Sequence, residues 1–439
     1  MEILYVPIGV PTFDLEEAER QFTASLAMLK KLSPDVIAPD RMLLSIESIT
    51  GYLASRSPDF VIVQNITFAN SEYASEIVSY TDCPILLWTL REDANVGGRL
   101  RLNSLTGAFS AANVFHSLAR SSFEYVFGSP EESSVRHKIK ACIDAVRVKK
   151  ELSELSIASI GNSPPGFGFG RALDAEIRKA FNVKLISIEA RELMSRAATY
   201  TEEDIEEFRK EIDVCIEAES IPNENIEKHL RLRKAYADFI RENRVGALAS
   251  RCWPDFFVDY KTPVCAVLSL LNDAGIPAAC EADIYGALSM FVASKLCGMP
   301  VFFGDPVAID EERNTITYWH CGMAPTKLAV QPKLGIHPNR KIGPVMNFCC
   351  KAHPEATVIR IGRKPNADFR MYIAKGETIA VPKGFQGTSI VFKPQNSVKQ
   401  LVEETIRAGW EPHYIVAPAD IAESCVYLAN FLQIEVCVF

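Results

Sequence analysis

Two carboxylates in the middle of the chain stand where short apolar runs end. Glu281 follows the run 276–280, and Asp305 follows the run 300–303, with one amphipathic stretch, 284–296, between them. We interpret this pattern as a βαβ unit, whose two strands are parallel and end at the same edge of a sheet. Open α/β sheets bind their ligands at that edge. Glu281 and Asp305 are therefore candidates for holding a divalent metal ion together and for moving protons.

Two histidines could complete such a site. If Asp310 pairs with Thr315 across a four-residue hairpin loop, the register brings His320 back opposite Asp305. His413 lies in a Pro-bounded turn near the end of the chain. Carboxylates grouped with one or two imidazoles suit Mn²⁺ or Mg²⁺ better than Zn²⁺.

Each of these residues also has a purely structural explanation. Asp283 begins a helix directly after Glu281, and Asp305 could cap a turn in the same way. His320 could be a buried histidine that hydrogen-bonds an aspartate, and His413 could be a surface residue. From residue type and spacing alone, both interpretations stay open.

The elements that must position these side chains alternate along most of the chain. Apolar runs such as 3–10, 60–63 and 83–90 are separated by longer amphipathic stretches, which indicates βαβ units and parallel sheets. We predict an N-terminal α/β domain over 1–155 and a middle α/β domain over 156–306 that carries the two carboxylates.

After Asp305 the pattern changes to short β-rich runs separated by Gly, Pro and Asn. This texture predicts a β-rich C-terminal domain over 307–439 with a closing helix. The predicted fold class is α/β, with two parallel-sheet, Rossmann-like domains followed by a mostly antiparallel, β-barrel-like domain.

The composition excludes several classes of protein. The 439 residues are 48% hydrophobic and 23% charged, as in ordinary globular proteins. A net charge of −8 argues against non-specific nucleic-acid binding and against an anionic membrane surface. No apolar run approaches the roughly 20 residues of a membrane span, and the N-terminal residues indicate a strand, not a signal peptide. Twelve scattered cysteines without a CxxC motif favour a reducing, cytoplasmic location.

Several segments resemble the L-fucose isomerase / L-arabinose isomerase family, in particular fucose-isomerase-like proteins. They read LNDAGIPAACEADIYGALS, GMPVFFGDPVAID and NTITYWHCGMAP in the middle of the chain. The closing segment GWEPHYIVAPADIAESCVYLANFLQIEV and the upstream segment RLNSLTGAFSAANVFHSLA resemble the same family. The resemblance covers most of the chain loosely and is specific at the spacing of the two carboxylates and at the His-Cys-Gly.

The resemblance implies a ligand set and an assembly. Glu281, Asp305 and His413 map onto the metal ligands, with His320 as a fourth. The implied ion is Mn²⁺, with Mg²⁺ or Co²⁺ as alternatives. The family also implies a homo-oligomer, expected to be a hexamer, with the active site near a subunit interface. Trp88 would then be the aromatic residue that a neighbouring subunit contributes.

Two further residues are candidates for contacting the substrate. Trp253 and Arg251 stand after a predicted strand of the middle domain, and Arg251 is a candidate contact for an anionic group. The glycine-rich run 161–170 has neither a dinucleotide fingerprint nor a Walker lysine, so we expect a ligand-facing or interdomain loop there.

The predicted reaction is a metal-dependent aldose–ketose isomerisation of an open-chain sugar. One carboxylate takes the proton from C2, and the other helps to return a proton at C1 of the ene-diol, while the ion chelates O1 and O2 as a Lewis acid. The substrate could be a deoxyhexose, a pentose or an anionic hexose such as a sulfonated one. Two alternatives remain: another metal-dependent sugar enzyme, such as an aldolase or epimerase, and a sugar-binding protein.

Overall fold

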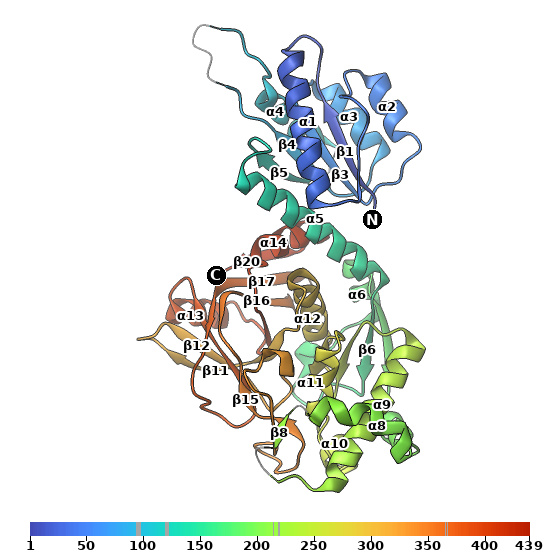
Figure 1. Ribbon diagram of the computed structural model, residues 1–439, viewed down its shortest axis with the longest axis vertical. Helices are drawn as coiled ribbons and strands as arrows, with labels where there is room; N and C mark the ends of the chain where they lie inside the picture. The colour runs from blue at the N-terminus through green and yellow to red at the C-terminus, as the bar shows by residue number, and fades with distance from the viewer. Residues whose placement is uncertain (94–97, 119–122, 214, 218–219, 365, 367) are drawn as a thin grey trace. The chain divides into compact units, whose positions relative to one another are not determined.

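The computed structural model describes residues 1–93, 98–118, 123–213, 215–217, 220–364, 366 and 368–439. The chain forms two compact units (Figure 1). The first is Met1–Lys150 with Val426–Gln433, and the second is Glu151–Cys425 with Ile434–Phe439. The predicted middle and C-terminal domains both fall in the second unit, and the three-domain division with boundaries at 155 and 306 stays a prediction.

The first unit contains a parallel sheet of five strands in the order β2-β1-β3-β4-β5. The strands are β1 (Ile3–Ile8), β2 (Val36–Ile37), β3 (Phe60–Asn65), β4 (Ile85–Thr89) and β5 (Phe123–Phe127). The helices between them are α1 (Leu15–Leu32), α2 (Ile46–Leu53), α3 (Ser71–Tyr80) and α4 (Ser104–Ser117), followed by α5 (Ser133–Glu154). Strands β1, β3 and β4 are buried along their whole length, as expected for a parallel sheet that is covered on both faces.

The second unit begins with a parallel sheet of four strands in the order β10-β9-β6-β7. They are β6 (Ser156–Ile160), β7 (Lys184–Ile188), β9 (Ala247–Ser250) and β10 (Ala278–Cys280). The connecting helices are α6 (Asp174–Phe181), α7 (Ala190–Ala197), α8 (Glu202–Asp213), α9 (Asn223–Asn243), α10 (Asp255–Val258) and α11 (Cys265–Asp273). Helix α12 (Ile284–Cys297) leads from this sheet into the C-terminal part of the chain.

The C-terminal part forms a closed antiparallel barrel of six strands. They are β11 (Phe302–Asp310), β12 (Thr315–His320), β16 (His353–Arg363), β17 (Phe369–Ile379), β18 (Thr388–Pro394) and β19 (Tyr414–Ala417). The order β18-β12-β11-β19-β16-β17 closes through a pairing of β17 with β18. Strands β15 (Phe348–Cys349) and β20 (Glu435–Val438) add to it in parallel, while β13 (Lys333–Gly335), β14 (Val345–Met346) and β8 (Ile216–Glu217) form a separate small sheet. Helices α13 (Val398–Arg407) and α14 (Ala422–Leu432) complete the chain. The predicted fold class is confirmed.

One predicted element is wrong. The strand after α12 does not return to the parallel sheet as the second strand of a βαβ unit. Instead, β11 pairs antiparallel with β12 and with β19 in the barrel. The apolar run 300–303 resembles a short parallel strand, but β11 continues through Asp305 to Asp310 because the hairpin that follows supplies it with an antiparallel partner.

The predicted hairpin is confirmed, with one shift. Asp310 pairs with Thr315, as expected. A bulge between Pro306 and Ala308 then moves the register, so that Asp305 lies opposite Trp319 and not opposite its neighbour His320.

Among the helices in the described ranges, none is long and apolar enough to cross a bilayer.

Candidate active site

The chain turns sharply where the strand β10 ends. Glu281 and Ala282 both have a left-handed backbone, with φ of 58° and 53°, which is uncommon for residues other than glycine. Asp283 follows and caps α12, where its carboxylate accepts a hydrogen bond from the backbone N–H of Gly286 at 2.9 Å. Such strained residues persist only where the surrounding structure holds them, and they cluster at functional sites.

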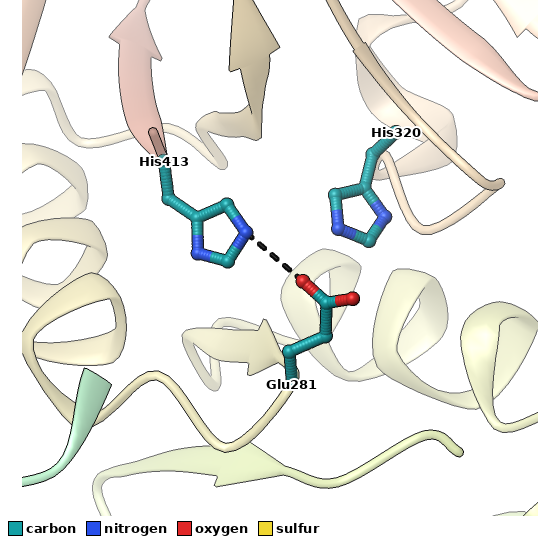
Figure 2. Close-up of side chains that lie close together, drawn as sticks. All are labelled: Glu281, His320 and His413. Atoms are coloured by element: carbon teal, nitrogen blue, oxygen red, sulfur yellow. Dashed lines mark hydrogen bonds and ion pairs between the residues drawn. The ribbon is translucent and has the colours of Figure 1, made fainter. Parts of the chain in front are cut away.

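The turn allows two carboxylates to contact one imidazole. His413 is fully buried before β19, and its Nδ1 lies 2.8 Å from an Asp283 oxygen. Its Nε2 lies 3.0 Å from a Glu281 oxygen (Figure 2). The half-buried Asp305, on β11, places a carboxylate oxygen 3.5 Å from the same Nε2. The structure therefore brings Glu281, Asp305 and His413 together, although Asp305 comes from the barrel and not from a neighbouring parallel strand.

A buried ion pair holds the far side of His413. Arg360, on β16, is fully buried and donates two hydrogen bonds to Asp283, at 2.6 and 3.0 Å. Burial alone would raise the pKa of Asp283, but the charge of Arg360 and the hydrogen bond from His413 hold that pKa below its ordinary value. An ionised Asp283 accepts from Nδ1–H, which directs Nε2 of His413 toward Glu281 and Asp305.

Sequence reasoning recognised Asp283 only as a helix cap and overlooked Arg360. The signal for Arg360 was an arginine within the apolar run Val358–Ile361, where a charge needs a buried partner. Its partner lies in a distant part of the sequence, so the pair could not be assigned from local pattern.

Burial and hydrogen bonding act in opposite directions on the pKa values of His413, Glu281 and Asp305. Burial disfavours the imidazolium, but hydrogen bonds to Asp283 and Glu281 outweigh it and raise the pKa of His413 to about 9. Burial likewise opposes ionisation of Glu281, but the hydrogen bond with His413 lowers the pKa of that carboxyl. For Asp305 burial prevails, and it raises the pKa to about 6 despite the charge of His413.

His320 faces the same group of atoms from the end of β12. It is 3% exposed, and its Nδ1 has no hydrogen-bond partner among the described residues. Burial lowers its pKa to about 4, so the ring is neutral at pH 7. One ligand atom from each of Glu281, His320 and His413 lies within 4.8 Å of the others (Figure 2). An unpartnered buried nitrogen beside carboxylates and a second imidazole fits a divalent metal ion, and Asp305 lies beside this trio.

Aromatic rings surround these polar atoms. Trp253 has its Nε1 3.4 Å from a Glu281 oxygen, and its role as a substrate contact stays a prediction. Phe169, on the glycine-rich loop after β6, has its ring centroid 5.1 Å from that of His413. The backbone of that loop lies very close to Asp283. A Cβ on Gly170 would lie 2.7 Å from Cα of Asp283, so only glycine fits there.

The two remaining predicted contacts have other partners. Arg251 pairs with Asp255 at 2.8 Å and donates to the backbone oxygen of Trp253 at 3.1 Å, so its charge is already compensated and it braces the loop that carries Trp253. Trp88 is fully buried in the first unit, and its Nε1 donates to the backbone oxygen of Gly128. A buried ring offers no face to a sugar, which corrects the prediction for Trp88.

A cavity of about 120 Å³ opens beside the trio. Its lining combines acidic, imidazole, thiol, aromatic and cationic side chains: Cys252, Trp253, Phe257, Cys265, Cys280, Glu281, His320, Cys321, His337, Asn339 and Arg340.

The chain has full-length relatives among characterised proteins. A sulfoquinovose isomerase from Clostridium sp. (strain MSTE9) is 50% identical, over 99% of this chain and 98% of the relative. Sulfoquinovose isomerases from Priestia aryabhattai and Alkalicoccus urumqiensis are 36% and 32% identical, and each alignment covers at least 99% of both chains. No family model matches the chain. A solved periplasmic binding protein of an arabinose transporter from Shewanella sp. ANA-3 aligns at 12% identity with a TM-score of 0.18, which carries no argument about fold.

Full-length similarity at this level, together with a carboxylate–imidazole site in an α/β-and-barrel fold, identifies the chain as an aldose–ketose isomerase, an intramolecular oxidoreductase. The chain belongs to the sulfoquinovose isomerase family. The predicted reaction class is therefore confirmed, and the aldolase, epimerase and sugar-binding alternatives are set aside.

Proposed function

We propose that the chain interconverts sulfoquinovose, a sulfonated aldohexose, with the corresponding ketose through an ene-diol. The names of the relatives support this substrate, because three proteins named sulfoquinovose isomerase align with at least 99% of the chain. Among the sugars that the sequence left open, the sulfonated hexose is thus the one proposed.

The observation that carries the proposal is the arrangement around His413. Its Nδ1 is hydrogen-bonded to Asp283, which Arg360 holds in turn, while its Nε2 faces Glu281 and the unpartnered Nδ1 of His320 lies close by. We propose that Glu281, His320 and His413, joined by Asp305, hold Mn²⁺, with Mg²⁺ or Co²⁺ as alternatives. When bound, such an ion supplies Lewis-acid stabilisation of the negative charge that develops on the sugar oxygens in the ene-diol.

The two carboxylates divide the proton transfer in this proposal. Glu281, whose pKa lies below its ordinary value, is ionised and takes the proton from C2. Asp305, whose burial raises its pKa to about 6, can carry a proton near neutral pH and delivers it to C1. Carboxyl groups whose environments separate their pKa values are a recurrent basis for acid and base roles.

The rings of Trp253 and Phe169 limit the access of water to the reacting atoms in this proposal. We further propose that the protein shares its origin and metal chemistry with the L-fucose isomerase / L-arabinose isomerase family. By that relation it would be a cytoplasmic homo-oligomer, expected to be a hexamer, with its active site near a subunit interface.

The test is an isomerisation assay with the purified chain, sulfoquinovose and added Mn²⁺, followed by NMR and mass spectrometry. In H₂O we expect a ketose of the same mass as the aldose, and in D₂O we expect solvent deuterium at C1 of that ketose, because C1 is protonated when the ene-diol collapses. Fragments with fewer carbons, or conversion of neutral aldoses only, would contradict the proposal. Boiled protein and reactions without sugar serve as controls.

A further inference from the structure

The end of the site at His413 is assigned to the reacting carbons of the sugar in the proposed function. Three carboxylates, Glu281, Asp283 and Asp305, gather there around His413, and the charge of Arg360 is already paired with Asp283. An open-chain sulfonated hexose carries its carbonyl at one end and its sulfonate at the other. This inference rests on the proposed function: if the carbonyl end lies at Glu281, the sulfonate needs a cationic contact at the far end of the same cavity.

The cavity beside the trio is lined by a cationic side chain as well as by a carboxylate. One part of its lining is Glu281 and His320, and another part is His337, Asn339 and Arg340. These last three residues belong to the loop 337–342 between β13 and β14. The loop is closed by hydrogen bonds from His337 N to the Ile342 oxygen at 2.9 Å and from Lys341 N to the His337 oxygen at 3.0 Å.

Arg340 carries a positive charge that no carboxylate of the described residues compensates. The other arginines near the site are paired: Arg251 with Asp255, and Arg360 with Asp283. In contrast, no carboxylate in the described part of the chain lies within ion-pair distance of Arg340. Its guanidinium carbon instead lies 5.9 Å from the ring centroid of Trp253 and 5.8 Å from that of Phe257. Stacking on two rings holds a guanidinium in place and leaves its N–H donors free for an anion.

Trp253 links the two ends of the cavity. The Nε1 edge of its indole lies 3.4 Å from a Glu281 oxygen, while Arg340 lies over its ring. One indole ring therefore separates the carboxylate proposed to act at C2 from the free guanidinium. A substrate that has its reacting carbons and its anionic group at opposite ends of one carbon chain would contact both groups along this ring.

His337 adds a second donor. Its Nδ1 accepts from the backbone N–H groups of Asn339 and Arg340, both at 3.2 Å, so in the neutral ring the proton is on Nε2. Burial, with the charges of Arg340 and Lys341, lowers its pKa to about 4, so the ring is neutral at pH 7. His337 is 5% exposed, and its Nε2 has no acceptor among the described residues.

We propose that Arg340, assisted by the Nε2–H of His337, binds the sulfonate of the substrate and makes the enzyme select sulfonated over neutral aldoses. A guanidinium offers several N–H donors in one plane, as recognition of a multi-oxygen anion requires. The selection arises because the charge of Arg340 stabilises a bound sulfonate. A neutral sugar in the same position gains no such stabilisation.

The test compares Arg340→Met with the unchanged chain on two substrates, sulfoquinovose and the same sugar without the sulfonate, 6-deoxyglucose. Methionine keeps an apolar stem between the two rings and removes the charge. We expect kcat/KM for sulfoquinovose to fall roughly 10- to 100-fold, the usual size of a lost charged hydrogen bond, while kcat/KM for 6-deoxyglucose stays within about 2-fold. Arg340→Lys should recover part of the loss. Arg313→Met, which removes the same charge from the exposed hairpin loop, is the matched control and should leave both substrates unaffected.

A binding measurement separates recognition from chemistry. The sulfonated alditol obtained by reducing sulfoquinovose is open-chain and cannot isomerise, so its Kd can be measured by calorimetry. We expect that Kd to rise in Arg340→Met by a factor similar to the fall in kcat/KM, and to rise with salt in the unchanged chain only.

The outcomes distinguish the two proposals. If the unchanged chain converts sulfoquinovose and Arg340→Met does so equally well, the proposed function stands and the role of Arg340 is refuted. Equal losses on both sugars would make Arg340 structural and would also refute it. If the unchanged chain does not convert sulfoquinovose at all, the proposed function fails, and this inference fails with it.

Discussion

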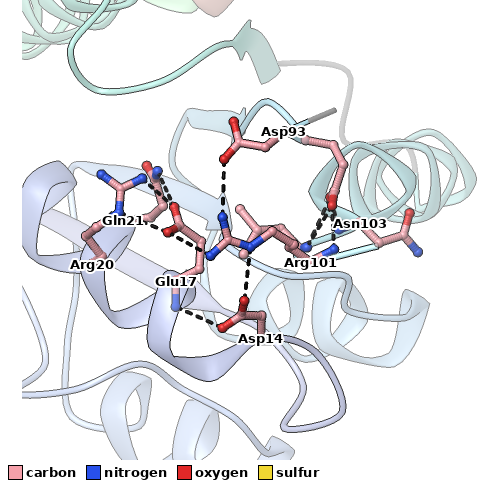
Figure 3. A network of polar contacts seen from close by, with 9 residues as sticks. Asp14, Glu17, Arg20, Gln21, Asp93, Arg101 and Asn103 are labelled. Atoms are coloured by element: carbon pink, nitrogen blue, oxygen red, sulfur yellow. Dashed lines mark hydrogen bonds and ion pairs between the residues drawn. The ribbon is translucent and has the colours of Figure 1, made fainter. Parts of the chain in front are cut away.

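The two units each gather acidic side chains, the first at the carboxyl edge of its parallel sheet and the second between such an edge and the barrel strand β11, yet only one of these two clusters is suited to chemistry. In the first unit, Asp14 and Asp93 follow β1 and β4, and Glu17 lies on the first turn of α1 (Figure 3). Arg101 contacts all three, at 3.0 Å from Asp14, 3.3 Å from Glu17 and 3.4 Å from Asp93. Arg20 forms a second pair with Glu17.

The second unit compensates its carboxylates differently. Glu281 and Asp305 face imidazoles and have no arginine partner among the described residues, and the buried Arg360 is directed to Asp283. His320 keeps an unpartnered nitrogen. Arginine neutralises an acidic cluster permanently, whereas imidazole can exchange its proton for a metal ion. An acidic cluster at a sheet edge therefore indicates a reaction site only where its positive partners can be displaced.

Metal removal should have the largest effect of these tests. We expect it to act through the carboxylate–imidazole cluster of the second unit and not through the acidic cluster of the first unit. Because Glu281, His320 and His413 are the proposed ligands, we expect chelation to abolish turnover and Mn²⁺ to restore it. Spectroscopic titration of the metal-free chain should give one tight Mn²⁺ site per chain, unchanged in Asp14→Asn. Full turnover after verified metal removal, or loss of that site in Asp14→Asn, would break the comparison.

Replacing the proposed base should come next in size. Glu281→Gln keeps the shape and one coordinating oxygen, so we expect turnover to fall about 10²- to 10⁴-fold without rescue by saturating Mn²⁺. The matched change in the other cluster, Glu17→Gln, should leave turnover unaltered. His413→Ala removes a proposed metal ligand but no group that transfers a proton. Added Mn²⁺ should therefore restore part of the turnover of this variant. If Glu281→Gln regains normal turnover at high Mn²⁺, Glu281 is only a ligand and the base is another group.

Loss of the buried Asp283–Arg360 ion pair next to His413 should lower both the stability of the fold and the affinity for metal. Asp283→Asn leaves Arg360 buried without a counter-charge, so we expect a loss of about 3–5 kcal/mol in the free energy of unfolding. Metal affinity should fall about 10- to 100-fold, because His413 loses the group that orients it. Asp93→Asn removes an exposed pair and should cost about 0–1 kcal/mol.

The double variant Asp283→Asn/Arg360→Met separates these two effects, by urea unfolding and Mn²⁺ titration. It removes the uncompensated charge and should recover much of the stability but not the metal affinity. Recovery of both would mean that Asp283 acts through the fold alone.

The smallest effect should be a shift in the acid sensitivity of the first unit. Hydrogen bonds from backbone N–H and Arg101 lower the pKa of Asp14, and hydrogen bonds with Arg20 and Gln21 lower that of Glu17. Groups with lowered pKa values stabilise the fold above their ordinary values of 3.8 and 4.5, and this stability is lost as pH falls through the folded values.

Arg101→Met should raise the folded pKa values toward the ordinary ones, so the free energy of unfolding should be lower at pH 7 and should fall less between pH 7 and pH 3 than in the unchanged chain. The measurement is urea unfolding between pH 3 and pH 7 (roughly the window that covers both carboxyl pKa values), followed by hydrogen exchange in peptides of β1 and β4. An unchanged pH profile would show that the network contributes nothing to stability.

The sequence by itself determined the local features of this protein. Apolar and amphipathic periods predicted the parallel sheets and the β-rich end, and the loop after Asp310 predicted the hairpin to Thr315. Residue type and family resemblance nominated Glu281, Asp305, His320 and His413. These inferences succeed because side-chain period, turn chemistry and charge at a strand end are properties of neighbouring residues.

Only the tertiary structure decided how distant segments meet. Strand β11 pairs within the barrel and not with the parallel sheet. Its Asp305 nevertheless lies beside His413, which it approaches from the barrel. The Asp283–Arg360 pair, the burial of Trp88 and the stacking of Arg340 on Trp253 all depend on which strands and loops pack together. Such contacts are selected by the free energy of the whole packed core, which no local pattern contains.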